Sequence, residues 1–389
     1  MTRLDFLAKR SGNRRSLSIP TPTLSRKPQM TVHLSAIFDV PAMAGILGEA
    51  MPRRTRNSRQ VALAVRPYAR EQRLRSWWHL WSTIGVLGVL TAILRSEIPW
   101  QIRFLFSIIS GLTIVRFFVL YHDHQHNAIL KGSKFADAVM LAFGLATLNP
   151  PSVWNRSHDH HHGNNCKNFG ANVGSYPLVT VEAYEKSSVW QRLRYAAARH
   201  PLTIVSGYVT IFLFGMCVVP LAVNPKRHLD AALSIVCHAG ILLWLASGRL
   251  EDLWFAGIIP FAISSAVGAY LFFAQHNFPG ARLQPGREWD YVDAALHSSS
   301  YIQMGLLMRW FTGNIGYHHV HHLNPKIPFY RLPEAMSAIK ELQAPVMTSL
   351  RPRDIAACLR LKLWDPVTEQ HVPWKRGRSL LQAESRAAA

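Results

Sequence analysis

The sequence is poor in cysteine and in carboxylates, and both shortages narrow the possible functions. Its 389 residues include only 4 cysteines, none in a CxxC pair, so neither a disulfide framework nor a thiolate metal site is expected. Asp and Glu together number 22 against 43 Lys and Arg, which leaves a formal net charge of +21. A metal site in this chain would therefore depend on histidine, of which there are 19.

The first 75 residues lack a long apolar run and carry much of the positive charge. No cleavable signal peptide is expected, because the first strongly apolar stretch begins only after residue 75. The basic residues are typical of the cytoplasmic flank of a membrane span, which anionic lipid headgroups attract. They do not predict nucleic-acid binding, because no nucleic-acid-binding motif accompanies them. We expect residues 1–75 to form a basic, largely flexible cytoplasmic tail.

Long apolar runs are abundant in the rest of the chain. Residues 77–94 and 104–121 are each long enough to cross a hydrocarbon core of about 30 Å. Because the connection between them is short, they are expected to form an antiparallel hairpin. Three further apolar runs follow at 202–223, 229–248 and 253–275.

Charge bias indicates which of these later runs cross the membrane. The loop 224–228 is basic and the loop 249–252 is not, which assigns the first to the cytoplasm and the second to the outside. Runs 229–248 and 253–275 then form a second hairpin, and 202–223 is an interfacial or re-entrant helix. In the alternative topology, 202–223 spans the membrane and the two following runs share one crossing.

Two smaller features complete the predicted topology. Residues 135–153 are apolar but contain Asp137 and two prolines, so we expect an interfacial or re-entrant element. Arg116 interrupts the second apolar run near its end and is expected to extend to the membrane interface.

The predicted fold is an all-α integral membrane protein. About four transmembrane helices would form two hairpins, with a cytoplasmic helical cap above them. This membrane domain with its cap would comprise residues 76–345, and residues 346–389 would form a cytoplasmic segment that ends in a basic tail.

Eleven of the 19 histidines are concentrated in three clusters at the ends of apolar runs. The clusters are HDHQH at 122–126, HDHHH at 158–162 and HHVHH at 318–322. Side chains three or four residues apart share a helix face, which joins His122 to His126 and groups three histidines in each of the other clusters. Neutral imidazole binds iron, copper, nickel or zinc. Because so many histidines exceed the needs of one ion, two ions are expected.

The chain resembles the membrane fatty acid desaturase family, whose signature is three histidine boxes with these spacings. Residues 310–317 before the third box and 323–332 after it are similar to bacterial acyl-lipid desaturases in particular. Gln275-His276-Asn277-Phe278-Pro279, at the end of an apolar run, is similar as well. The resemblance covers residues 75–345, and the two tails resemble nothing informative.

The resemblance implies a non-haem centre of two iron ions held by histidine. Carried over by position, its ligands would be His122, His126, His158, His161, His162, His276, His318, His321 and His322. The other cluster histidines would surround the centre or lie at the surface: His124, His160 and His319. Asp123, Asp159 and Asn314 are candidates to orient ligands through hydrogen bonds, although each carboxylate could equally be solvated. No further catalytic residue is expected.

The resemblance also implies a reaction, in which a lipid-linked acyl chain gains a cis double bond. Dioxygen would be the co-substrate, and a separate ferredoxin-, flavodoxin- or cytochrome-type carrier would deliver two electrons. The acyl-CoA branch of the family has an asparagine one helical turn before the histidine at 276. Phe272 occupies that position here, which disfavours acyl-CoA as substrate.

The expected location is multi-pass in a bacterial inner membrane, with the active site facing the cytoplasm. The alternative function is that of a hydroxylase, ketolase or epoxygenase of the same di-iron superfamily, acting on a hydrocarbon or carotenoid. A metal transporter is disfavoured, because it would place its histidines inside the spans, whereas these lie at the ends.

Overall fold

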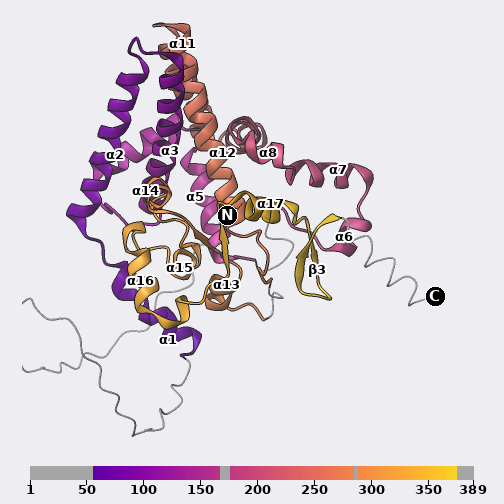
Figure 1. Ribbon diagram of the computed structural model, residues 1–389. Coiled ribbons are helices and arrows are strands. Elements are labelled where there is room, and N and C mark those ends of the chain that lie inside the picture. The colour runs from indigo at the N-terminus through magenta and orange to yellow at the C-terminus, as the bar shows by residue number, and fades with distance from the viewer. Residues whose placement is uncertain (1–55, 167–175, 284–287, 375–389) are drawn as a thin grey trace, which may run out of the picture. The chain divides into compact units, whose positions relative to one another are not determined.

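Helices account for most of the computed structural model, which describes residues 56–166, 176–283 and 288–374 of the unit Thr55–Ala389 (Figure 1). Four helical segments are long and apolar enough to cross a membrane. They are α2 (Arg73–Leu94), α3 (Trp100–Gln125), α10 (Leu229–Ala246) and the continuous segment of α11 (Leu250–Asp252), η3 (Leu253–Ile258) and α12 (Ile259–Ala274). These are the four runs predicted to span, and α3 packs against both α2 and α12.

The run 202–223 is broken into three shorter pieces. These are α8 (Pro201–Val205), the π-helical η2 (Tyr208–Val218) and α9 (Val219–Val223). The apolar helix Tyr208–Val223 is shorter than the four candidate spans. Figure 1 shows the coil at α8 nearly end-on, whereas α2, α3 and α12 stand upright. This agrees with the predicted topology in which the run does not cross the membrane.

Residues 135–153 form α4 (Lys134–Ala146) and the start of α5 (Pro151–Gly163). Between the two helices, Leu148 adopts a φ of 60°, which is not a helical conformation. Pro151 then begins α5, where a proline is tolerated because the first N–H groups of a helix have no partner within it. The α4 helix packs against α10, and the Ser234 hydroxyl donates to the Leu145 carbonyl over 2.8 Å. The break lets α5 leave in a new direction with the second histidine cluster.

A buried cation lies where α3 meets the α11 end of the last long segment. Arg103 is 1% exposed, donates to Glu251 over 2.6 Å and forms an ion pair with buried Asp252. Arg249 contributes a further hydrogen bond of 3.1 Å to the Asp252 carboxylate. These contacts join helices that are about 150 residues apart in the sequence.

Arg116 does not extend to the membrane interface, and that prediction was wrong. Its side chain is 2% exposed and donates to the Trp310 carbonyl over 2.5 Å and to the Thr83 hydroxyl over 3.1 Å. Its guanidinium also lies 4.2 Å from the centroid of the Trp310 ring. The physical reason is that α14 (Leu306–Phe311) packs on α3 and offers carbonyl and aromatic partners that a single-helix view cannot anticipate.

The remaining elements are short. In chain order they are η1 (Arg66–Ala69), α6 (Val181–Glu185), α7 (Val189–Ala198), α13 (Tyr291–His297), α15 (His318–Leu323), η4 (Phe329–Arg331), α16 (Leu332–Ala338), η5 (Lys340–Leu342) and α17 (Pro352–Arg360). The strand β1 (Tyr301–Gln303) pairs in parallel with β2 (Met347–Ser349), and β3 (Leu363–Asp365) pairs antiparallel with β4 (Gln370–Val372). The β1–β2 pairing joins the segment after residue 345 to the main domain.

Part of the N-terminal segment 1–75, expected to be largely flexible, is folded. The helix α1 (Ser58–Ala64) begins at a capping box formed by Asn57 and Gln60, and it buries Val61. Val61 and Val65 belong to the same apolar core as the long helices. The burial of these two valines is the physical reason for the helix. Residues 1–55 lie outside the described residues.

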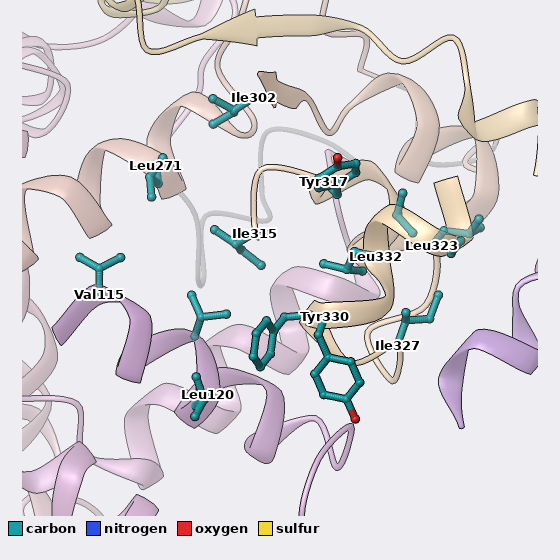
Figure 2. Packing of buried hydrophobic residues seen from close by; sticks show 14 of the residues in the cluster. Val115, Leu120, Leu271, Ile302, Ile315, Tyr317, Leu323, Ile327, Tyr330 and Leu332 are labelled. Atoms are coloured by element: carbon teal, nitrogen blue, oxygen red, sulfur yellow. The ribbon is translucent and has the colours of Figure 1, made fainter. Parts of the chain in front are cut away.

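One continuous core connects the long helices to the third histidine cluster. Figure 2 shows Val115 and Leu120 of α3 near Ile315, with Leu323 and Leu332 further along the same packed group. The α15 helix, which carries the third cluster, therefore shares one apolar core with α3, which carries the first.

Candidate metal centre

Four separate segments bring histidines to one place. The end of α3 supplies His122 and His126, and one face of α5 supplies His158, His161 and His162. His276 follows the last turn of α12, and α15 supplies His318, His321 and His322. All nine histidines predicted as ligands converge, although up to about 200 residues separate them in the sequence.

The nine histidines divide into two groups. One group has five members, His122, His126, His158, His162 and His321, and the other has four, His161, His276, His318 and His322. Within each group, one ring nitrogen from every member lies within 4.8 Å of the others. His161 and His162 are neighbours on α5 but belong to different groups, so this helix links the two. Two adjacent ion sites are therefore geometrically possible.

The spacing of the nitrogens fits bound cations. In the four-histidine group, His276 Nε2 lies 3.0 Å from His161 Nε2 and 2.9 Å from His318 Nε2. In the five-histidine group, His162 Nε2 lies 3.1 Å from both His158 Nε2 and His321 Nε2. Two imidazole nitrogens bonded to one ion at about 2.1 Å, at right angles, are about 3.0 Å apart. The set of donors therefore matches an ion in each group.

Burial keeps these imidazoles uncharged. It lowers the pKa of His276 to about 4. Burial, reinforced by repulsion among neighbouring imidazolium charges, holds the pKa well below the usual range for His126, His158, His161, His162, His318, His321 and His322. Neutral rings keep a lone pair free at neutral pH, which metal binding requires.

Hydrogen bonds on the far side of two rings orient them. His276 Nδ1 lies 3.0 Å from the Ser298 carbonyl, so Nδ1–H donates there and Nε2 faces the other histidines. His122 Nδ1 lies 3.1 Å from Asp123 Oδ1, and the other oxygen of this carboxylate accepts the Phe329 amide over 2.7 Å. Asp123 is 1% exposed, so it is not solvated. Such partners determine which nitrogen of a ring is available to a metal.

The substitution Asp123→Asn should weaken metal binding without unfolding the chain. The amide keeps the volume of the carboxylate but loses the charge that holds the His122 N–H. We expect metal affinity to fall by about 10- to 100-fold. Competition with a chelator, followed by metal analysis, measures this change. The matched control is Asp159→Asn in the second cluster. Equal losses in both variants would contradict an orienting role for Asp123.

The other predicted neighbours of the site are placed differently. Asp159 and His160 are exposed, because they lie on the face of α5 opposite the three converging histidines. Asn314 donates to the Phe329 carbonyl and accepts from Arg309, so it stabilises the turn before α15 and contacts none of the nine. His124 contacts Asp137 and the Ile129 carbonyl. His319 is fully buried with Nε2 3.2 Å from the Leu342 carbonyl, outside both groups.

An apolar cavity of about 490 Å³ adjoins the second histidine cluster. Its wall includes His158, the Trp154 ring stacked on His158 with centroids 4.7 Å apart, and Phe272. Tyr208, His238 and Phe261 also line it. Among the described lining residues there is no Asp, Glu, Lys or Arg. Trp154, Tyr208 and His238 were not predicted from the sequence. The only available signal was that Trp154 precedes His158 by one helical turn.

Comparisons with known proteins converge on one family. The sequence model of the family described as "Fatty acid desaturase" matches residues 98–351. A "Fatty acid desaturase" of Bacillus subtilis (strain 168) is 28% identical over 323 residues, which cover 82% of this chain and 91% of that protein.

Two further relatives have more specific names. The "sn-1 oleoyl-lipid 12-desaturase" of Picosynechococcus sp. is 22% identical over 276 residues, covering 69% of this chain and 77% of that protein. The "Delta(12) acyl-lipid conjugase (11E,13E-forming)" of Impatiens balsamina is 24% identical over 348 residues, covering 80% of this chain and 89% of that protein. Both names refer to enzymes that act on acyl lipids.

Proposed function

Because the chain belongs to the fatty acid desaturase family, we propose that it introduces a cis double bond into a lipid-linked acyl chain. Dioxygen is the proposed oxidant, and a separate ferredoxin-, flavodoxin- or cytochrome-type carrier supplies two electrons. Family membership itself makes the protein an oxidoreductase. The observation that most supports the finer proposal is the uncharged, apolar cavity beside His158.

Nine histidines are proposed to hold two irons, one in the group of five and one in the group of four. When bound, the irons supply dioxygen activation, which removal of hydrogen from an unactivated methylene requires. The ring contacts of Asp123 and Ser298 keep His122 and His276 oriented. Eight of the nine histidines are buried and His276 is partly buried, a setting that would exclude water from the reacting carbon.

The properties of the cavity favour a substrate whose acyl chain lies inside the cavity and whose polar head remains outside. Its uncharged walls suit a hydrocarbon, and its volume lies within the usual range for ligand pockets. Trp154 and Phe272 stand beside the histidines, where they would confine the methylenes next to the centre. Phe272 lies where the acyl-CoA branch has a water-binding asparagine, and its ring centroid is 5.3 Å from that of His161. A membrane lipid is therefore favoured over acyl-CoA.

The proposed location is a bacterial inner membrane, with two helical hairpins and the histidine-bearing cap in the cytoplasm. All nine histidines share one site, so their segments must lie on one side of the bilayer. The basic residues before α2 and the Lys226-Arg227 loop favour the cytoplasm for that side.

Cysteine labelling tests this topology. In a background in which the four native cysteines are replaced by Ser, Lys226→Cys should react with a membrane-impermeant reagent only from the cytoplasmic side. Leu250→Cys should react only from the outside. Both positions are exposed, so access to the reagent depends on sidedness. Labelling of Lys226→Cys from outside would mean that 202–223 spans the membrane.

Lipid profiling tests the proposed reaction. A host that expresses the chain together with a reducing carrier should accumulate monounsaturated acyl chains in its membrane lipids, and mass spectrometry after double-bond derivatisation locates the bond. A host that expresses the His321→Ala variant is the control. Hydroxylated, keto or epoxy products would favour the alternative function and overturn the desaturase proposal.

A further inference from the structure

The cavity is elongated along α12. At one end, Phe272 contacts the His161 ring with centroids 5.3 Å apart. At the other end, Phe261 contacts His238 with centroids 4.6 Å apart. Both phenylalanines line the cavity and belong to α12, eleven residues apart, which corresponds to about 16 Å along the helix axis. The Phe261 end is therefore the end far from the histidine centre.

A hydrogen-bonded pair of polar side chains stands at this far end. The Tyr208 hydroxyl lies 2.5 Å from His238 Nε2, and His238 Nδ1 lies 2.7 Å from the Ala146 carbonyl. The carbonyl can only accept, so Nδ1–H donates to it and Nε2 accepts the tyrosine O–H. Both polar groups of His238 are thus satisfied, and the pair presents ring surface to the cavity.

The pair joins three elements at this position. Tyr208 comes from η2, His238 from the middle of α10 and the carbonyl from the end of α4. The π-helical conformation is rare in proteins, and its single turns frequently lie at functional sites; Tyr208 is the first residue of the π-helical η2. Because each partner is anchored to a different element, the wall they form cannot yield by rotation of a single side chain.

We propose that the Tyr208–His238 pair is the stop for the methyl end of the acyl chain and so determines which chain lengths the enzyme accepts. This inference rests on the proposed function. A chain that enters past the histidines can advance only until its methyl group meets the two rings. The reacting carbon is then the one that lies beside His158 and Phe272. One methylene too many must be accommodated outside the cavity or by distortion, which disfavours the longer chain by about 10- to 200-fold in an apolar pocket.

Two variants with opposite expected effects on acyl-chain length test the proposed stop. Tyr208→Ala removes the ring and deepens the cavity, so the preferred acyl length should increase or, for one length, the double bond should move toward the carboxyl end. Gly268→Leu does the reverse. Gly268 lines the cavity between Phe272 and Phe261, and no atom lies within 4 Å of an added Cβ. The leucine side chain of Gly268→Leu should therefore occupy part of the cavity and shorten the preferred acyl chain.

The measurement is the product profile from a series of saturated fatty acids of increasing length, fed to a host expressing each variant. The ratio of products from chains that differ by one methylene should change about tenfold. Tyr208→Phe retains the ring and should keep the wild-type length. Phe214→Ala is the matched control, because it removes an aromatic ring from the same helix η2 on a side that does not line the cavity.

The outcomes separate the two proposals. If wild type desaturates lipids and Tyr208→Ala reaches the membrane but leaves the length profile unchanged, the stop is overturned while the proposed function stands. If wild type produces no unsaturated lipid, the proposed function itself fails. If Tyr208→Ala does not accumulate in the membrane, Gly268→Leu still decides, because an unshifted profile in that variant contradicts a cavity that ends at the pair.

Discussion

Replacement of His276 or His321 with Ala is expected to abolish desaturation, although the variants should still insert into the membrane. His321 belongs to the five-histidine group and His276 to the four-histidine group, so each substitution removes a donor from a different proposed ion. The long apolar helices that drive insertion are untouched. Lipid profiling measures the activity, and membrane fractionation with an antibody to a tag measures the insertion.

Iron content separates loss of metal from loss of fold. Purified wild-type protein should contain two irons per chain, and each of the two variants should retain about one, because the other group stays complete. The control is His160→Ala, on the exposed face of α5, which should match wild type in iron and activity.

His319→Ala is the more informative control. It should keep both irons and much of the activity, because His319 lies outside both groups. The loss of its contact with the Leu342 carbonyl should still reduce the stability of the fold by about 1–3 kcal/mol. A single zinc in place of iron, or an inactive His319→Ala with normal metal content, would contradict the proposed ligand set.

Arg103→Ala is expected to destabilise the folded protein by about 3 kcal/mol. The side chains of Arg103 and Asp252 are only 2% and 3% exposed, so removal of the cation leaves a carboxylate in a site with little access to water. Arg249 still contacts Asp252 over 3.1 Å, which places the expected cost at the low end for a broken buried ion pair. Unfolding in detergent micelles measures this free energy.

A double variant tests whether the loss arises from a buried carboxylate that has lost its nearest cation. Arg103→Ala combined with Asp252→Asn should recover part of the stability, because residue 252 then carries no buried charge. Lys186→Ala, which breaks an exposed Lys186–Glu182 pair at 2.5 Å, should leave the stability unchanged. If Arg103→Ala behaves like this surface control, the pair does not stabilise the packing of α3 against α11.

The helices that are long and apolar enough to cross a membrane could be predicted, because hydropathy and length are local properties of a segment. The runs 77–94, 104–121, 229–248 and 253–275 all reappear as long apolar helices. The folded part of the N-terminal segment was missed, because Val61 and Val65 gain stability only from a core that lies far away in the sequence. Arg116 was misjudged for the same reason, since its partner carbonyl belongs to Trp310.

Which histidines can act together on one helix face follows from the amino-acid order alone, because spacings of three and four residues have a fixed geometry in a helix. The amino-acid order could not divide the nine into groups of five and four, since that division depends on how α3, α5, α12 and α15 pack. Nor could it distinguish Asp123 from Asp159, which occupy the same place in their clusters but face the core and the solvent respectively. These features, and the contact of Tyr208 with His238, arise from tertiary packing, because each depends on contacts between segments that local sequence does not relate.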